Sequence, residues 1–255
     1  DKADRLKEFG AEISASIKDV VTNSDIIITM LTDDNAVEKV MGSDEFISNI
    51  NEGATVIDMS SVNPVLTIKY SKKLKEKKID YLDAPVSGGT IGAEEATLAI
   101  MVGGDEETFK NCYELLKKMG NPTLVGPVSS GQISKLANQI IVGVTIGAVA
   151  EAVTLCEKSG TNPNKMIEAL SGGWADSKIL QTHGKRMINK DFTPKGKTTT
   201  QLKDMTNIIN AGKAAETHLP ISSLVKEMYK DLVADGQGNT DHSSLYKVIE
   251  KINKK

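Results

Sequence analysis

Apolar residues in the first half of the chain fall in short runs bounded by polar residues. Runs of this length, rich in Val and Ile, are typical of buried strands in a parallel sheet. Longer segments with helical spacing separate them. Asp33 and Asp34 are candidates to cap one of these helices, and Pro64 is placed to begin another. Strands that alternate with helices at this spacing predict βαβ units around a mainly parallel sheet. The predicted strands cover residues 25–31, 54–60, 79–86, 97–104 and 122–126.

The pattern changes near residues 127–131, because no convincing strand follows. Residues 131–160 predict one long helix, and the run "IIVGVTIGAVA" makes its middle apolar nearly all round, so we expect it to be buried between other elements. Five further segments have helical spacing: 162–173, 177–188, 202–218, 220–236 and 242–252. The sequence therefore predicts an α/β domain over residues 1–128 and an all-α domain over 129–255.

Composition narrows the function classes. The chain has 255 residues, of which 39% are hydrophobic and 25% charged, as in ordinary globular proteins. A net charge of −3 argues against nucleic acid or an acidic membrane surface as the main partner. The two cysteines form no CxxC motif and favour a reducing, cytoplasmic location. The three histidines lack metal-ligand spacing, so no metal is expected.

One motif is absent. No G-x-G-x-x-G occurs in the sequence. The backbone N–H groups that usually bind the pyrophosphate of a dinucleotide therefore cannot be located. The chain also opens on "DKADRLKEFGAEI", without an initiator Met and in the middle of an α/β unit. We therefore expect a segment upstream to be missing.

The turn Ser87-Gly88-Gly89 follows the third predicted strand. Ligands of open α/β sheets bind at the carboxyl ends of strands, and glycines let an anion approach the backbone closely. A turn that binds an anionic oxygen is one interpretation. A tight turn after Pro85 with no ligand is the other.

Lys135 lies in the first turns of the long helix, with Asn138 and Gln139 three and four residues later on the same face. A half-buried lysine near the positive end of a helix is suited to acid/base work. The alternative is a lysine that faces solvent. Lys203 and Asp204, read by themselves, indicate surface charge.

Together, several segments resemble the β-hydroxyacid dehydrogenase family, which includes 3-hydroxyisobutyrate dehydrogenases and tartronate semialdehyde reductases. The resemblance covers essentially the whole chain. It rests on "SDIIITMLTDD", "VIDMSSVNP", "LDAPVSGGTIGAEEATLAIMVGG", "GQISKLANQ" and "LKDM", in the family's order. "ALSGGWADSKILQTHGKRMI" and "DHSSL" look most like the tartronate semialdehyde reductase branch.

The resemblance implies a fold and an activity. The fold is α/β: an N-terminally truncated Rossmann-like domain, a long interdomain helix and an all-α domain. The missing first strands and Gly-rich loop would occupy roughly 30–35 residues, the length of one βαβ unit. The activity is NAD- or NADP-dependent reduction of a small β-semialdehyde acid, in a cleft at the domain boundary.

The resemblance also implies roles for single residues. Lys135 is the catalytic acid/base, and the Ser87, Gly88, Gly89 turn holds the substrate carboxylate. The family often has Asn where Gln139 stands, so Asn138 and Gln139 are both assigned to the substrate. Trp174 and Asp241 are candidates for the substrate pocket, although Trp174 is alternatively a core residue. The expected cofactor contacts are Leu31, Thr32 and Asn35 on the adenosine side, Ser61 near the nicotinamide ribose, and Lys203 near the nicotinamide.

Some positions depart from the family pattern. Thr32 and Met205 replace the usual Pro and Leu, and "PKGKTTTQ" replaces a "PGF" segment. Two other functions stay open: a 3-hydroxyisobutyrate dehydrogenase and, because the dinucleotide loop is missing, a non-catalytic helical dimerisation module with the long apolar helix as its interface. A longer, decarboxylating sugar-acid dehydrogenase fits less well. We expect a small-molecule substrate, no nucleic acid or membrane partner, and a homo-oligomer, either dimer or tetramer.

Overall fold

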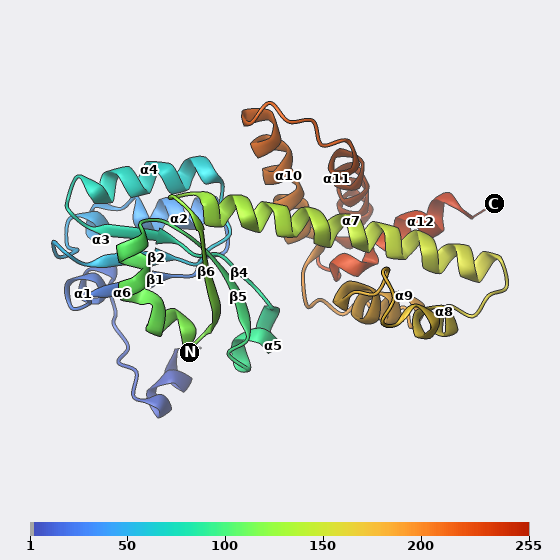
Figure 1. Cartoon of the computed structure of the whole chain (residues 1–255), viewed down its shortest axis with the longest axis horizontal. Helices are drawn as coiled ribbons and strands as arrows, with labels where there is room; N and C mark the ends of the chain where they lie inside the picture. Colours follow the sequence, from blue (N-terminus) through green and yellow to red (C-terminus); the bar gives the residue numbers. More distant parts are fainter. Residues whose placement is uncertain (1–2, 255) are drawn as a thin grey trace. The chain divides into compact units, whose positions relative to one another are not determined.

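The computed structural model describes residues 3–254, which form two compact units that divide after Lys135. The units divide within the long helix α7 (Ser130–Lys158), seven residues after the division predicted at 128/129. Each unit has its own hydrophobic core. The α/β part therefore comes first and the helical part second, as the sequence predicts (Figure 1).

The first unit is built on one six-stranded sheet in the order β1-β2-β3-β5-β4, with β6 on the other side of β5. β1, β2 and β3 run parallel, and β5 and β6 run parallel. β3 and β4 pair with β5 in the antiparallel sense, so the sheet is mixed where a mainly parallel one was expected. The strands are β1 (Ile26–Thr29), β2 (Thr55–Asp58), β3 (Asp80–Asp83), β4 (Val86–Ser87), β5 (Leu98–Gly103) and β6 (Gly120–Gly126).

Two local features explain the mixed sheet. Pro85 has no N–H to donate, and it splits the predicted strand 79–86 into β3 and β4. Only helix α5 (Gly89–Glu94) connects β4 to β5. A six-residue helix is too short for a parallel crossover, so the chain must turn back and pair antiparallel.

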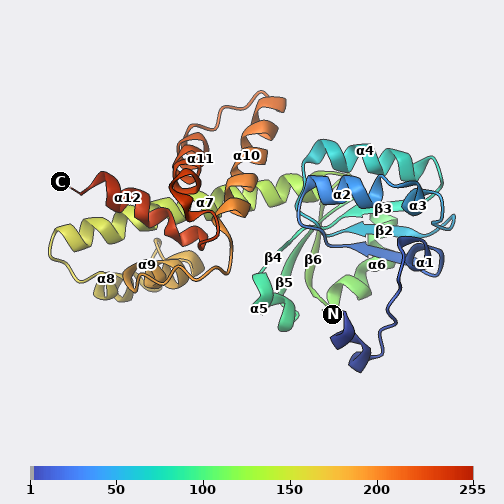
Figure 2. The same cartoon turned by 180° about the vertical axis from the view of Figure 1, so that it is seen from behind.

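Helices cover both faces of this sheet. Ile27, Val56 and Tyr81 share one core with α1 to α4, whereas Ile57 and Leu82 share the other with α6. Figures 1 and 2 show α2 and α4 on the face opposite α6. The helices are α1 (Ile17–Thr22), α2 (Asp34–Met41), α3 (Asp44–Ile47), α4 (Pro64–Lys75) and α6 (Glu106–Lys117), preceded by the 3-10 helix η1 (Asp4–Phe9).

The capping predictions hold, and three short helices were not predicted. Asp33 caps α2 by accepting from Ala36, and Pro64 begins α4. The helices α1, α3 and α5 have at most six residues, too few for an apolar period to repeat.

The second unit is helical, and the described residues after α7 add only an isolated bridge between Lys197 and Asp241. Figures 1 and 2 show α10 and α11 on one side of α7, and α8 and α9 on the other. Gly184 ends a π-helical turn that leads into α9. The helices are α8 (Pro163–Leu170), η2 (Leu180–Gly184), α9 (Lys185–Ile188), α10 (Thr198–Ala214), α11 (Pro220–Leu232), η3 (Val233–Gln237), η4 (His242–Leu245) and α12 (Tyr246–Ile252).

Helix α7 is buried on one face only. By length and composition alone it could cross a membrane, yet Ile146, Val149 and Val153 lie in the core of the second unit. The opposite face is apolar but open, with Ile141 65% and Leu155 68% exposed. The expectation of burial all round is therefore wrong for this chain, because its own helices cover only one side of α7.

Gly131, at the start of α7, provides the first test of this packing. A Cβ there would lie 2.4 Å from the Met101 carbonyl oxygen and 2.6 Å from the Asp83 carbonyl oxygen. Gly131→Ala is expected to lower the free energy of unfolding by about 2 kcal/mol. Gly147→Ala on the same helix is the matched control, because its nearest neighbours would lie at 3.7 and 3.8 Å. It should be neutral or stabilising by about 0.5 kcal/mol. Urea unfolding measures both, and equal stabilities would contradict the packing described.

Candidate active site

Lys135 reaches the glycine turn within the first unit. Its Nζ donates to the carbonyl oxygen of Val86 at 2.9 Å, immediately before Ser87. The side chain is half-buried. The ammonium therefore lies beside the turn, and the alternative of a lysine directed into solvent is wrong.

The turn itself requires glycine. Gly88 has φ of 146° and Gly89 has φ of 65°, both in the region that favours glycine. Ser87 pairs with Ala99 of β5, which fixes the start of the turn. The backbone at Gly88 and Gly89 is exposed. The arrangement therefore offers an accessible main chain next to a cation.

A buried carboxylate holds the start of α7 against β3. Asp83 accepts from the backbone N–H groups of Ser129 at 2.7 Å and Gln132 at 2.8 Å. Burial raises the pKa of Asp83 to about 6, although these hydrogen bonds lower it in part. The sequence analysis did not single out Asp83 or Gln132. The only available signal was the position of Asp83 in "LDAPV", just before the turn.

The loops after β1 and β2 are joined by hydrogen bonds. The N–H of Leu31 donates to Ser60 Oγ at 2.9 Å, and the N–H of Asn63 donates to Asp34 Oδ1 at 3.0 Å. Leu31 and Ser61 are half-buried, whereas Thr32 and Asn35 are exposed. These loops follow the carboxyl ends of parallel strands, where α/β sheets bind nucleotides.

A polar network in the second unit joins three predicted site residues. Gln139 Nε2 donates to Asp204 Oδ2 at 2.6 Å, and Asn138 Nδ2 donates to Gln139 Oε1 at 2.8 Å. Lys203 Nζ lies 3.3 Å from Asp204 Oδ1. Asp204 is buried, so the interpretation of the Lys203-Asp204 pair as surface charge is wrong for Asp204. This carboxylate fixes the side chains around it.

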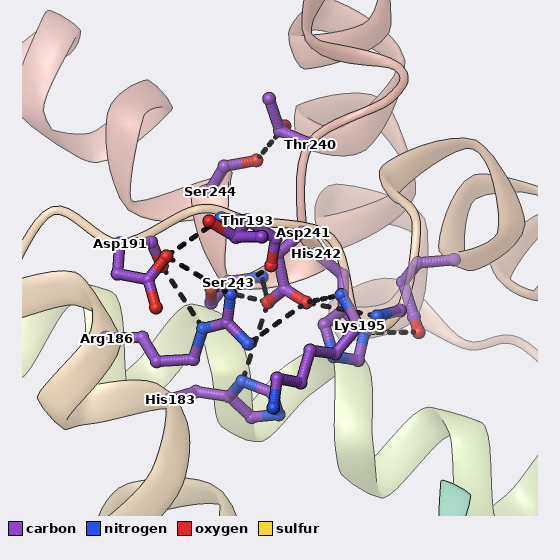
Figure 3. A network of polar contacts seen from close by, with 12 residues as sticks. His183, Arg186, Asp191, Thr193, Lys195, Thr240, Asp241, His242, Ser243 and Ser244 are labelled. Atoms are coloured by element: carbon purple, nitrogen blue, oxygen red, sulfur yellow. Dashed lines mark hydrogen bonds and ion pairs between the residues drawn. The ribbon is translucent and has the colours of Figure 1, made fainter. Parts of the chain in front are cut away.

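Asp241 is the centre of another buried network (Figure 3). Its Oδ2 accepts from the N–H groups of Lys195 at 3.0 Å and Gly196 at 3.1 Å. Its Oδ1 accepts from the backbone and hydroxyl of Ser243 at 3.1 and 2.6 Å. Arg186 lies 3.6 Å from Oδ2. Asp241 was expected in the substrate pocket, but its carboxylate is fully buried and serves to tie three segments of the helical unit together.

Two histidines accompany this carboxylate. His183 and His242 meet edge to face, with ring centroids 4.7 Å apart. Burial lowers the pKa of both, that of His242 to about 4, so both are neutral at pH 7. Nitrogens of both rings and an oxygen of Asp241 lie within 4.8 Å of one another, a spacing compatible with a metal. The N–H and hydroxyl donors described above already occupy the carboxylate, and the guanidinium of Arg186 adjoins it, so this set is a poor metal site.

Trp174 is not part of the core. It is 107% exposed in the loop between α8 and η2, so the alternative of a core tryptophan is wrong. Gly172 and Asp176 close the loop through a hydrogen bond of 2.8 Å from the backbone N–H to Oδ2.

Two family models match the chain. The NAD-binding domain of 6-phosphogluconate dehydrogenase matches residues 1–147, and the NAD-binding domain of NADP-dependent 3-hydroxyisobutyrate dehydrogenase matches residues 129–249. The 2-hydroxy-3-oxopropionate reductase of Escherichia coli (strain K12) is 41% identical, over 97% of this chain and 86% of that protein.

The chain belongs to the β-hydroxyacid dehydrogenase family.

Other members of the family are also similar to this chain. The mitochondrial 3-hydroxyisobutyrate dehydrogenase of Drosophila melanogaster is 30% identical, over 97% of this chain and 79% of that protein. A solved structure of the Mycobacterium tuberculosis 3-hydroxyisobutyrate dehydrogenase with L-serine matches with a TM-score of 0.88 at 27% identity, over 97% of this chain and 87% of that one. As a β-hydroxyacid dehydrogenase, the chain is an NAD- or NADP-dependent oxidoreductase with a small-molecule substrate. This membership favours the enzyme over the non-catalytic module.

The residues present fit part of such a cofactor. The joined loops after β1 and β2 offer half-buried Leu31 and Ser61 beside exposed Thr32 and Asn35, a mixture suited to adenosine and ribose. The sequence contains no G-x-G-x-x-G to hold the pyrophosphate. The fit therefore concerns the adenosine and ribose ends of the dinucleotide.

Asp241 gives a prediction on acid stability. Burial raises its pKa, but hydrogen bonds from Ser243, Gly196 and Lys195 outweigh burial and hold the pKa at about 2 in the fold, below the ordinary 3.8. The stabilisation is complete above pH 3.8 and is lost as the pH falls through about 2. It amounts to about 2 kcal/mol at neutral pH.

Asp241→Asn should therefore lower the free energy of unfolding at pH 7 by about 2 kcal/mol and flatten its fall between pH 4 and pH 2. Urea unfolding across this range measures the change. Asp231→Asn, which removes an exposed carboxylate on α11, is the matched control. A wild-type pH slope in Asp241→Asn would disprove this account of the buried network.

Proposed function

We propose that this chain reduces 2-hydroxy-3-oxopropionate (tartronate semialdehyde) to the corresponding hydroxy acid with NADH or NADPH. The observation that carries the proposal is the hydrogen bond from Lys135 to Val86, which holds a cation beside the glycine turn. The 41% identical Escherichia coli relative bears the name of this activity.

The proposed reaction needs one proton donor and a set of hydrogen-bond donors that bind the substrate carboxylate. The nicotinamide cofactor, when bound, would supply a hydride to the aldehyde carbon, and negative charge would develop on the carbonyl oxygen. The Lys135 ammonium gives a proton to that oxygen, and its charge stabilises the oxyanion as it forms. The Ser87 hydroxyl and the exposed backbone at Gly88 and Gly89 hold the substrate carboxylate through charge-assisted hydrogen bonds.

The resemblance assigns the remaining roles. Asn138 and Gln139 are assigned to the substrate and Lys203 to the nicotinamide, and the hydrogen bonds and ion pair around Asp204 orient all three side chains. Trp174, an exposed aromatic, is proposed as a wall of the substrate pocket. A direct contact between Asp241 and substrate is not part of the proposal, because its oxygens are occupied. The proposed cofactor contacts are Leu31, Thr32, Asn35 and Ser61.

Lys135→Ala tests the central role. Loss of the proton donor should lower kcat by about 10²- to 10⁴-fold. The oxidation of NADH or NADPH with tartronate semialdehyde, followed at 340 nm on the full-length protein, measures it. Lys158→Ala, at the exposed end of the same helix, removes the same charge and should leave kcat unchanged. Wild-type turnover in Lys135→Ala would refute the assignment.

A second activity is supported by other members of the family. The Drosophila protein and the Mycobacterium structure are both named 3-hydroxyisobutyrate dehydrogenases. A panel of tartronate semialdehyde, methylmalonate semialdehyde and 3-hydroxyisobutyrate, each with both cofactors, decides between the two activities by kcat/KM.

In either case Ser87→Ala should raise KM for the carboxylate substrate about 10-fold, because one hydrogen bond to a charged group is lost. KM for the dinucleotide should not change.

We further propose a homo-oligomer, dimer or tetramer. The open face of α7 in the second unit presents Ile141 and Leu155, which lie on one helix face and are both more than 60% exposed. A second copy of the chain would remove this apolar surface from water by a self-complementary contact.

We also propose a cytoplasmic location, with which the free thiols Cys112 and Cys156 agree.

Ile141→Lys tests the oligomer. A charge on the open face of α7 should shift the mass measured by light scattering towards that of the monomer. Val65→Lys on α4, a position that is 67% exposed, is the matched control and should keep the wild-type mass. An unchanged mass for Ile141→Lys at micromolar concentration would place the interface elsewhere.

A further inference from the structure

The carboxylate of Asp83 makes both hydrogen bonds of a helix capping box, although it belongs to a strand. In a capping box, the N-cap side chain accepts from the third helical N–H, and the third side chain accepts from the N-cap N–H. Here Ser129 precedes α7 and Gln132 is its third residue. Asp83 accepts from both N–H groups, at 2.7 and 2.8 Å.

Because Asp83 caps the helix, the side chain of Gln132 makes a different connection. Its Oε1 accepts from the N–H of Val62 at 3.1 Å, and its Nε2 donates to the carbonyl oxygen of Ser60 at 2.8 Å. Gln132 and Ser60 are both buried. The first turn of α7 is therefore attached to the end of β3 by Asp83 and to the loop after β2 by Gln132.

The backbone packs closely around this carboxylate. A Cβ at Gly103 would lie 2.6 Å from Asp83 Oδ1 and 2.7 Å from the Gly131 nitrogen. Ser129 has φ of 81°, a conformation that non-glycine residues adopt only when their surroundings impose it. Its N–H is one of the two that Asp83 holds. The start of α7 is thus packed closely against β3 and β5.

Lys135 lies one turn further along. It is three residues after Gln132, and residues at this spacing share a helix face. A rotation of the first turn would move the ammonium away from Val86 and from the glycine turn that follows it. We propose that Asp83, together with the side chain of Gln132, positions Lys135 for the proton transfer: both attachments of the first turn of α7 are needed to hold Lys135 beside the turn. This inference rests on the proposed function.

Asp83→Asn tests the proposal on the full-length protein. The amide keeps the shape of the side chain but offers one acceptor oxygen, and its NH₂ group would face a backbone N–H. We expect kcat with tartronate semialdehyde to fall about 10- to 100-fold, as for a misplaced catalytic group. KM for the dinucleotide should stay within about twofold, because the loops after β1 and β2 are not attached to Asp83 directly. Asp80→Asn, exposed on the same strand, removes the same charge and should behave as wild type.

A double-mutant cycle separates positioning from general stability. If Asp83 acts through Lys135, then Asp83→Asn should change the residual activity of Lys135→Ala by less than about twofold. If Asp83→Asn lowers activity by the same factor with and without Lys135, the positioning role is overturned while the proposed function stands. If Lys135→Ala alone keeps wild-type turnover, the proposed function itself fails.

Gln132→Met is a second variant in case Asp83→Asn does not fold. It keeps the length of the side chain and removes both of its hydrogen bonds, so the first turn loses its attachment to the loop after β2. A fall in kcat that disappears in the Lys135→Ala background supports the proposal. A folded Gln132→Met enzyme with wild-type kcat overturns it.

Discussion

The carboxylate of Asp83 ties the end of strand β3 to the start of helix α7, and the candidate site depends on this connection. Two backbone N–H groups would otherwise be buried without an acceptor at the first turn of the helix. Burying a carboxylate is unfavourable, which is why its pKa rises to about 6, but the two amides compensate in part. The same bonds that satisfy the helix end also attach the first turn of α7 to the end of β3. In our proposal, the position of Lys135 on α7 depends on these two hydrogen bonds.

The helical unit also contains a buried carboxylate that accepts hydrogen bonds from several backbone N–H groups. Asp241 is buried, and it accepts from the backbone of Lys195, Gly196 and Ser243. Arg186 balances its charge, and the neighbouring histidines are neutral. Its pKa falls to about 2, whereas that of Asp83 rises, because more donors converge on Asp241. In both units, then, a buried carboxylate accepts backbone N–H groups from a segment distant along the chain.

The activity of the family suggests what these hydrogen-bond networks are for in this chain. A β-hydroxyacid dehydrogenase must hold a small anion and deliver one proton to a nearby oxygen. In the proposed mechanism, the glycine turn and Lys135 supply both parts from one unit, and Lys135 contacts Val86 directly. Asp204 orders Gln139, Asn138 and Lys203 in the other unit by the same principle of a buried acceptor. Site side chains are thus held by carboxylates that do not themselves meet the substrate in the proposed mechanism.

The sequence by itself determined the local elements, because these depend on near neighbours along the chain. Five apolar runs gave the sheet, Asp33 and Pro64 marked helix starts, and the motif "LDAPVSGG" with Lys135 identified the family. The antiparallel pairing of β5, the open face of α7, and the burial of Asp204 and Asp241 required the tertiary structure, since each depends on which distant segments cover which surface. Asp83 is the clearest case. It looks like an ordinary strand residue in sequence, and only the fold brings it, 46 residues away along the chain, to the amide of Ser129.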